Sequence, residues 1–407
     1  MTSAFTWLDH SEYERRKMLD VIDLFRERDT RDELGLGTIR DAFADLFFPA
    51  TSTIQTRARY FFFVPWMYLE LERKRIPSAA ISDRARKYET SLIDALLASE
   101  DTDGVIGKVA GKSLQRLPSN IYWQGLGVFG IRLFPGSQPQ YHRSLDRFYI
   151  LTGRQARDDD GEPVGGHIQA NWHPGLPNPP GGFPGTASLG LTRTEARFLQ
   201  ERIVARSPES LLRFLVDRGR EAEEIGFPWQ HPQFAEFPAR CQDQLFHARN
   251  FSEGMHGASL LYNLMLAEQT ARDDLVSSYL RWIKEWGEAL EGRLGELRGW
   301  ERDRFWLLVA SQSARLSHGT RAFVETWLGL VLTEETPRQA ASGKDARQLV
   351  HGRERALKGS LARLDNRRAL ELWTGAAGTA QLNFRWRIAQ GILKDVHRGL
   401  LLGNRDA

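Results

Sequence analysis

The sequence has 407 residues, of which 41% are hydrophobic and 26% are charged; these proportions exclude a disordered or collagen-like chain and indicate a globular one. Its single cysteine, Cys241, excludes an internal disulfide and a zinc site built from cysteines. No stretch contains the roughly 18 apolar residues that cross a bilayer, and residues 1–10 lack the pattern of a secretory signal. We therefore expect a cytoplasmic protein without a membrane contact.

Charge is distributed unevenly along the chain, although the formal net charge is only +3. Residues 1–56 carry a net charge of −4, residues 57–143 of +5, residues 144–337 of −6 and residues 338–407 of +8. Arginine supplies 46 of the 55 basic side chains. Its planar guanidinium group suits phosphates and carboxylates, because it donates two parallel hydrogen bonds. The high arginine content therefore favours recognition of such groups. The alternative is that the arginines are spread over solvated helix faces and bind no partner.

Apolar residues recur at helical spacing through most of the chain. Thr192 followed by Glu195 fits a capping box, which begins a helix. Ser207 and Pro208 fit the cap and the first position of a helix that includes residues 211–216. The best strand signals, which also fit helix ends, are residues 128–133 and 148–151. The long helical patterns cover residues 10–28, 255–270, 274–294, 302–317, 321–332 and 377–401.

Residues 152–190 interrupt this pattern with nine glycines and six prolines in 39 residues. Prolines prevent a helix there, and loops longer than about 12–15 residues are usually functional loops or linkers. We therefore predict an N-terminal helical part over residues 1–151 and a C-terminal helical part with a basic end over residues 191–407. The fold class that follows is mainly α, with many helices in two parts and little or no β structure.

The most unusual run is residues 51–68, where hydroxyl residues precede two arginines and an aromatic stretch. Two helical residues separated by one position point about 200° apart. We expect Arg57 to face inward, because Ile54, Phe61 and Val64 lie at helical spacing from it. It should pair with Asp41 or Asp45, since burying an arginine without a partner is costly. We expect Arg59 to face outward and contact an anion or nucleic acid, beside rings that offer stacking surfaces. Internal ion pairing of both arginines is the alternative.

Pro65 lies within the same run and disfavours helical geometry at Val64, so we expect a kink or break there. Large aromatic side chains at helical spacing are typical of a core. We therefore assign structural roles, together with Arg57, to three tryptophans: Trp66, Trp123 and Trp386.

Residues 104–113 contain a Gly-Lys-Ser sequence that resembles a phosphate-binding loop. The position that requires glycine is occupied by Ile106, and no apolar strand precedes the run, so we reject that interpretation. On a helix, Lys108, Lys112 and Arg116 would instead form one basic row at a spacing of four residues. This row is a candidate site for nucleic acid or anions, and a solvated helix face is the alternative.

Side chains typical of catalysis and metal binding show no known spacing in this sequence. None of the ten histidines lies at a metal-binding spacing, and the chain lacks the Gly-x-Ser-x-Gly motif of a nucleophilic serine. Cys241 fits a small buried hydrophobic residue better than a nucleophile. We therefore assign no catalytic residues, no metal site and no cofactor.

The C-terminal region combines many arginines with aromatic residues. Arg385 and Arg387 flank Trp386, and arginine beside tryptophan suits nucleic-acid binding through charge and stacking. We take these two arginines as candidate contacts. Amphipathic helices that bury the aromatic residues and expose their arginines to water are the alternative.

Five segments carry specific motifs: FTWLD at residues 5–9, RDELGLGTIRD at 31–41, TSTIQTRARYF at 51–61, LPSNIYW at 117–123 and NFRW at 383–386. Through them the chain resembles, over nearly its whole length, an uncharacterised bacterial family, a domain of unknown function. The resemblance brings no catalytic residues. It implies a genetic setting beside helicase, phospholipase-D-like nuclease and DNA-methyltransferase genes in bacterial defence islands, and thus an accessory part in handling foreign DNA.

We therefore expect a non-enzymatic accessory component of a DNA-targeting anti-phage defence system, which contacts nucleic acid or a partner through arginine-rich faces. The expected partners are DNA or RNA and a helicase, nuclease or methyltransferase protein. One alternative is a scaffold for protein–protein interaction without nucleic acid, since tryptophan, tyrosine and arginine are common at interfaces. The other is an enzyme whose site assembles from residues distant in the sequence.

Overall fold

The computed structural model describes residues 32–153, 169–220, 225–313, 315–332 and 337–402. Across these residues the chain forms sixteen α-helices, and its extended pairing consists of one isolated bridge between Arg132 and Trp172. The predicted mainly α fold is confirmed. The predicted helix over residues 10–28 lies outside the described residues.

The chain divides into two compact units, and neither of them is continuous in the sequence. Unit 1 comprises residues 1–43 and 243–383. Unit 2 comprises residues 44–242 and 384–407. Each unit has its own core, so each is described by itself below.

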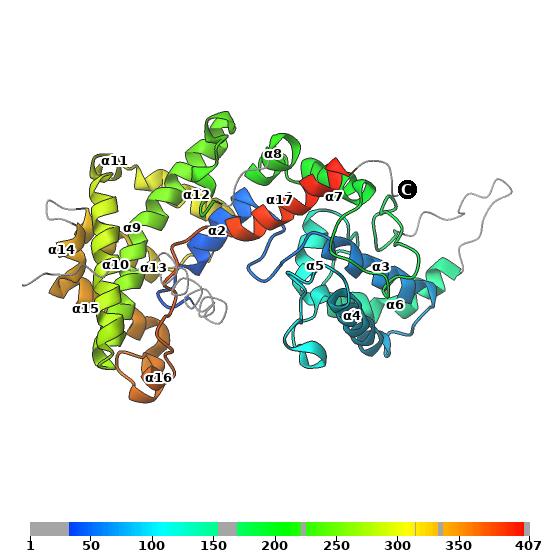
Figure 1. Cartoon of the computed structure of the whole chain (residues 1–407), viewed down its shortest axis with the longest axis horizontal. Coiled ribbons are helices and arrows are strands. Elements are labelled where there is room, and N and C mark those ends of the chain that lie inside the picture. Colours follow the sequence, from blue (N-terminus) through cyan, green and yellow to red (C-terminus); the bar gives the residue numbers. More distant parts are fainter. Residues whose placement is uncertain (1–31, 154–168, 221–224, 314, 333–336, 403–407) are drawn as a thin grey trace, which may run out of the picture. The chain divides into compact units, whose positions relative to one another are not determined.

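Unit 1 contains α10 (Asp273–Glu291), which packs against α14 (Pro337–Ser342) (Figure 1). Helix α13 (His318–Val331) packs against both α14 and α15 (Lys344–Lys358). The fully buried ring of Trp327, on α13, belongs to this core. The unit also contains the start of α2 (Gly37–Phe47), most of α9 (Ala239–Gln269), α11 (Leu294–Arg298), α12 (Arg302–Gln312), α16 (Arg367–Glu371) and a 3-10 helix at Gly359–Leu361.

Unit 2 contains the last helix of the chain, α17 (Trp386–Leu401), which lies along α7 (Arg193–Arg206) and also contacts α8 (Leu211–Arg218) (Figure 1). Helix α3 (Tyr60–Arg73) packs against α4 (Ile81–Leu97). The unit also contains α5 (Pro118–Val128), which packs on α3, together with α6 (Gln138–Gly153) and 3-10 helices at Gly111–Ser113, Pro228–Gln230 and Phe234–Glu236.

Helix α3 is strongly apolar, and ten of its fourteen residues are buried. It continues through Pro65, so of the predicted kink or break at Val64 the break is wrong. Proline removes one helical hydrogen bond, at a cost of about 3 kcal/mol. Each fully buried aromatic side chain contributes roughly 1.5–3 kcal/mol, and several of them flank Pro65 on both sides. The free energy gained by burying these aromatic side chains therefore outweighs the cost of a proline inside the helix.

The starts of α7 and α8 test two predicted helix caps. Thr192 and Glu195 form the predicted capping box at the start of α7, so that prediction is confirmed. Helix α8 begins at Leu211, and the hydroxyl of Ser210 accepts from the backbone N–H of Arg213 at 3.1 Å. The cap predicted at Ser207 is therefore wrong by three residues, because a second serine lies closer to the apolar run.

Residues 169–190, the described part of the predicted loop over 152–190, pack within unit 2. They contain no helix, as their prolines predict. Trp172 and Leu189 are buried in the core of the unit. Residues 154–168 lie outside the described part of the chain.

Candidate functional site

Arg57 is an internal brace of unit 2. Its Nε lies 3.0 Å from both carboxylate oxygens of Asp395, and its Nη1 lies 2.7 Å from an oxygen of Asp101. The same Asp395 also accepts from the backbone N–H of Ala58 at 2.9 Å. Arg57 therefore faces inward and is paired, as predicted, but the predicted partners, Asp41 and Asp45, are wrong. The actual partner, Asp395, lies 338 residues away in the sequence.

Arg59 is more deeply buried than Arg57, with 5% of its side chain exposed. Its Nη2 lies 2.8 Å from a carboxylate oxygen of Glu195, and its Nη1 donates to the carbonyl of Ser188 at 3.0 Å. The predicted outward orientation is wrong because α3 begins at Tyr60. Both arginines precede the helix, so the helical angle between them does not apply. Arg59 is a structural residue rather than a surface contact.

The predicted basic row over residues 108–116 does not form an α-helix. Turns and one 3-10 helix, Gly111–Ser113, occupy this segment, and Gly107 and Gly111 have positive φ angles that a continuous right-handed helix excludes. Lys108 is exposed and donates to Thr102 Oγ1 at 3.0 Å, and Arg116 is exposed. The side chain of Lys112 lies outside the described part. The prediction of a basic row on one helix face is therefore wrong, because the positive φ angles of the two glycines prevent an α-helix from forming here.

The two arginine candidates near the C-terminus differ in their surroundings. Arg385 lies 2.6 Å from Asp45 Oδ1 and donates to the carbonyl of Thr51 at 2.8 Å, so it binds within unit 2. Arg387 is exposed on α17. Of the candidate contacts described in unit 2, Lys108, Arg116 and Arg387 thus remain open to solvent.

The three tryptophans assigned structural roles are all buried. In each, the indole N–H donates to a backbone carbonyl: from Trp66 to Pro177 at 2.6 Å, from Trp123 to Gly136 at 3.1 Å and from Trp386 to Ile225 at 3.0 Å.

A chain of polar side chains is buried between α3, α4, α5 and α6. Glu89 accepts from the backbone N–H and the hydroxyl of Ser119, at 2.6 and 3.0 Å. Gln138 donates to Ser119 Oγ and to the hydroxyl of Tyr68, which lies 2.8 Å from Nε2 of His142. Burial raises the pKa of Glu89 to about 7, and it lowers the pKa of His142 to about 4. Because Glu89 and Ser119 are both buried and bonded to each other, this chain of hydrogen bonds stabilises the core of unit 2.

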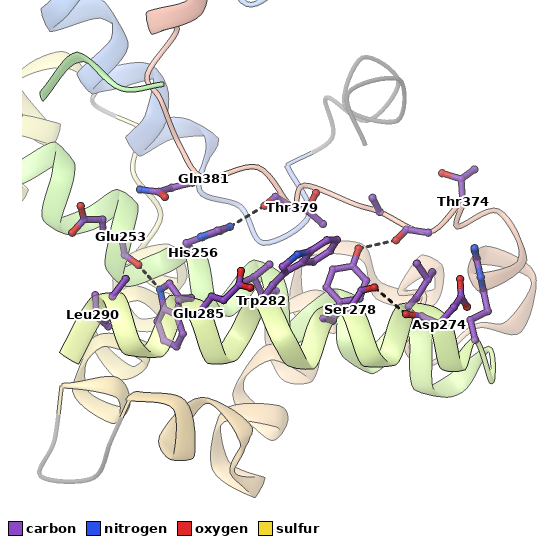
Figure 2. Close-up of a pocket in the computed structure, with 18 of the residues that line it drawn as sticks. Glu253, His256, Asp274, Ser278, Trp282, Glu285, Leu290, Thr374, Thr379 and Gln381 are labelled. Carbon is purple, nitrogen blue, oxygen red and sulfur yellow. Dashed lines mark hydrogen bonds between the residues drawn. The ribbon is translucent and has the colours of Figure 1, made fainter. Parts of the chain in front are cut away.

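The candidate functional site lies in unit 1, where α9, α10 and residues 374–381 enclose a groove of about 760 Å³ (Figure 2). Figure 2 shows Ser278 and Trp282 along α10, below the extended segment that carries Thr379. Leu260 of α9 and Leu290 of α10 contribute apolar surface. The groove is therefore an aromatic and apolar wall on α10 that meets a non-helical segment, residues 374–381.

Three aromatic residues of α10 form this wall at helical spacing: Tyr279, Trp282 and Trp286. The hydroxyl of Tyr279 donates to the carbonyl of Gly375 at 2.7 Å, and burial raises its pKa, so it stays a donor. The indole of Trp286 donates to the carbonyl of Glu253 at 2.7 Å. Trp282 is half-buried and meets the Tyr279 ring edge-on at 5.0 Å. Trp282 is thus the ring with the most open face.

The segment of residues 374–381 is fixed to α9 by bonds from side chains of α9 to its backbone carbonyls. His256 Nε2 lies 3.0 Å from the carbonyl of Thr379, and Asn263 donates to the carbonyl of Ala377 at 2.7 Å. Gly375 has a φ of +119°, a conformation that other residues rarely adopt. Because these bonds hold both edges, the groove is formed before any ligand arrives.

Charged side chains lie at both ends of the groove. At the C-terminal end of α10, Arg249 and Arg293 both bind the carboxylate of Glu253. At the other end, the guanidinium of Arg272 lies 5.8 Å from the ring centre of Trp373, and the described residues place no carboxylate within ion-pair distance of it. Arg293 also pairs with Glu296, so the two arginines at the C-terminal end are matched by two carboxylates. At the other end, the guanidinium of Arg272 lies over an indole, and Asp274 also lines the groove there.

Comparison with known protein families places this chain. The sequence pattern of a family of unknown function (DUF6361) matches residues 2–398. The chain belongs to that family. No curated protein and no solved structure matches it. In the described ranges, no group of three or more His, Cys, Asp or Glu side chains is placed to hold a metal, and no helix is long and apolar enough to cross a membrane.

Sequence reasoning for this family member missed the groove altogether. The spacing of Tyr279, Trp282 and Trp286 predicts a helix face but is equally typical of a core. The sequence pattern predicted a helix over residues 377–401, but the helix begins at Trp386, so residues 377–381 of the groove were assigned to a helix that does not include them. The sequence did contain one general signal. The C-terminal region, which includes Trp373, carries a net positive charge.

Proposed function

We propose that this protein is a non-enzymatic binding protein that holds single-stranded nucleic acid in the groove of unit 1. The observation that carries the proposal is the half-buried ring of Trp282 on a preformed wall, with Arg272, which has no carboxylate partner among the described residues, at one end of the groove. Aromatic rings stack on unpaired bases, and arginines contact the backbone phosphates. Double-stranded nucleic acid keeps its bases stacked inside the helix, so it cannot use such a wall.

The dimensions of the groove support an elongated ligand. Arg272 and Arg293 flank α10, whose nineteen residues span roughly 30 Å at 1.5 Å per residue. A volume of about 760 Å³ lies within the usual range of ligand pockets, roughly 300–1,000 Å³. A single strand of nucleic acid that runs along α10 places a phosphate near Arg272 and a base against Trp282.

The biological setting that we propose is bacterial antiviral defence. The support for it is the resemblance stated above, which implies neighbouring helicase, nuclease and methyltransferase genes. Helicases and nucleases produce single strands. A protein that holds such strands would act as their accessory, and its partners would be those enzymes.

The test is binding of labelled single-stranded DNA and RNA oligonucleotides to the full chain, measured by fluorescence anisotropy at several salt concentrations. Trp282→Ala removes the stacking surface and is expected to cost about 1–3 kcal/mol of binding free energy, or roughly 5- to 150-fold in Kd. Trp229→Ala is the matched control, because Trp229 is also half-buried but lies in unit 2, stacked on Phe227. Its affinity is expected to equal that of the wild type.

Two outcomes would contradict this function. In the first, the wild type binds no oligonucleotide even at low salt, where phosphate contacts are strongest. In the second, Trp282→Ala and Trp229→Ala bind equally well, which moves the contact away from the groove. An interaction scaffold without nucleic acid, the competing function, predicts the first outcome.

A further inference from the structure

Two arginines of α7 converge on one glycine turn in unit 2. Arg202 and Arg206 lie four residues apart on the helix, so they share one face. A β-carbon placed on Gly130 would lie 2.9 Å from Nη2 of Arg202 and 3.4 Å from Nε of Arg206. Gly130 has a φ of +64°, which favours glycine. The turn therefore leaves room for both guanidinium groups at one point.

Arg202 is fixed in place by two contacts. Its Nε donates to the carbonyl of Phe129 at 3.0 Å, and its Nη1 lies 3.1 Å from Nε2 of His173. On the other side of the imidazole, Nδ1 accepts from the backbone N–H of Gly175 at 3.1 Å. A neutral imidazole has one N–H and one acceptor nitrogen. Since Nδ1 is the acceptor, Nε2 carries the hydrogen.

Two donors therefore face each other, the Nε2–H of His173 and an N–H of Arg202. The other tautomer moves the conflict to Nδ1, which would then face the N–H of Gly175. In either arrangement the imidazole accepts from only one of the two donors that face it. An oxygen of a bound anion that accepts from both His173 and Arg202 removes this conflict.

Negative charge is scarce at this turn. Among the described residues, no carboxylate lies within ion-pair distance of Arg202 or Arg206, and Glu201 offsets the charge of Arg202 only in part. Burial and the positive charge of Arg206 lower the pKa of Arg202. Burial and the positive charge of Arg202 lower the pKa of His173. Bringing like charges together is unfavourable, so an anion stabilises the cluster.

We propose that Arg202, Arg206 and His173 form a binding site for a phosphate group. Guanidinium groups bind phosphate through two parallel hydrogen bonds, which their planar fork supplies. Each arginine also has a structural explanation. Arg206 stabilises the C-terminal end of α7 through the helix dipole, and Arg202 binds the carbonyl of Phe129. Neither role explains why an N–H of Arg202 faces the imidazole of His173. The site lies in unit 2, so it stands on observations separate from those of the groove.

The phosphate can come from a nucleic-acid backbone or from a free phosphorylated molecule, and the experiment separates the two. The variant is Arg206→Gln, which removes one charge from an exposed side chain and leaves the contacts of Arg202 in place. The matched control is Arg197→Gln, an exposed arginine of the same helix. Circular dichroism melting of both variants checks that the fold is kept.

The first measurement is a calorimetric titration of the full chain with inorganic phosphate. We expect Arg206→Gln to weaken phosphate binding about tenfold, as loss of one charge-assisted pair does, and Arg197→Gln to leave it unchanged. Equal binding by both variants, or no phosphate binding by the wild type, overturns the site.

The second measurement is the salt dependence of oligonucleotide binding. If a backbone phosphate occupies the site, Arg206→Gln lowers the slope of log K against log salt by about 0.7 for a single strand. If that slope is unchanged while inorganic phosphate still depends on Arg206, the ligand is a free phosphate. If no oligonucleotide binds at all but inorganic phosphate still depends on Arg206, the proposed function fails and this site stands.

Discussion

In unit 2, Arg57 and Arg59 are held by the carboxylates of Asp395 and Glu195, whereas in unit 1 Arg272 stacks on Trp373 beside an open groove. All these arginines have aromatic neighbours in space or in sequence. What distinguishes them is whether the fold supplies a buried carboxylate. A paired arginine braces the core, and an arginine with only a ring beside it keeps its hydrogen bonds for a ligand.

The largest expected effect comes from breaking the most deeply buried pair. Arg59→Ala leaves the carboxylate of Glu195 uncompensated, with 3% of its side chain exposed. We expect a loss of about 3–5 kcal/mol in the free energy of unfolding, measured by urea denaturation. Arg387→Ala, at an exposed site of the same unit, should change it by less than about 0.5 kcal/mol. Similar losses in both variants would show that Arg59 is no brace.

Glu89 is a buried carboxylate of unit 2 that has no ion-pair partner among the described residues, so its effect on stability should depend on pH. The pKa of Glu89 is raised to about 7 from an ordinary 4.5, so the folded protein holds a proton that the unfolded chain releases. Its stabilising contribution is complete below about pH 4.5 and is lost as the pH rises through 7, by about 3 kcal/mol. Glu89→Gln should remove this part of the decline. Denaturation midpoints of both proteins from pH 4.5 to 8 measure it, and parallel curves would contradict the prediction.

The smallest effect on stability is expected in unit 1. Arg272→Ala removes one stacked guanidinium, which contributes about 0.5–1 kcal/mol at such a site, so the midpoint of denaturation should barely move. Oligonucleotide affinity should nevertheless fall, and the salt slope with it. Arg281→Ala, an exposed arginine of α10 that does not line the groove, is the control. A large loss of stability in Arg272→Ala would make this arginine a brace like those of unit 2.

Local patterns in the sequence predicted local structure well. The capping box of Thr192 and Glu195 and most long helices follow from spacing alone, because each depends on residues within a few positions of one another. Arg57 was predicted to face inward from its helical spacing to apolar residues, and it does face inward although α3 begins only at Tyr60. Its need for a carboxylate followed from the cost of an unpaired buried charge. Its partner was not predictable, since Asp395 comes from the far end of the chain.

The errors arose where a helix was extended beyond its real limits. Arg59 was placed on a helix that begins one residue later, and Lys108 was placed on a helix that glycines exclude. The groove of unit 1 was out of reach for another reason. It requires α9, α10 and residues 374–381 to meet, and no spacing within one segment contains that information.

The bond between Arg57 and Asp395 also has a consequence for synthesis on the ribosome. Chains emerge from the N-terminus, and domains generally fold as they appear. Residues 44–242 emerge early, but the helix that carries Asp395 emerges only after all of residues 243–383 have been made. Until then, Arg57 has only Asp101 of its two carboxylate partners, and α7 lacks the helix that covers it. The first unit to begin folding is therefore the last to finish, and its nascent form must stay unaggregated while unit 1 is translated.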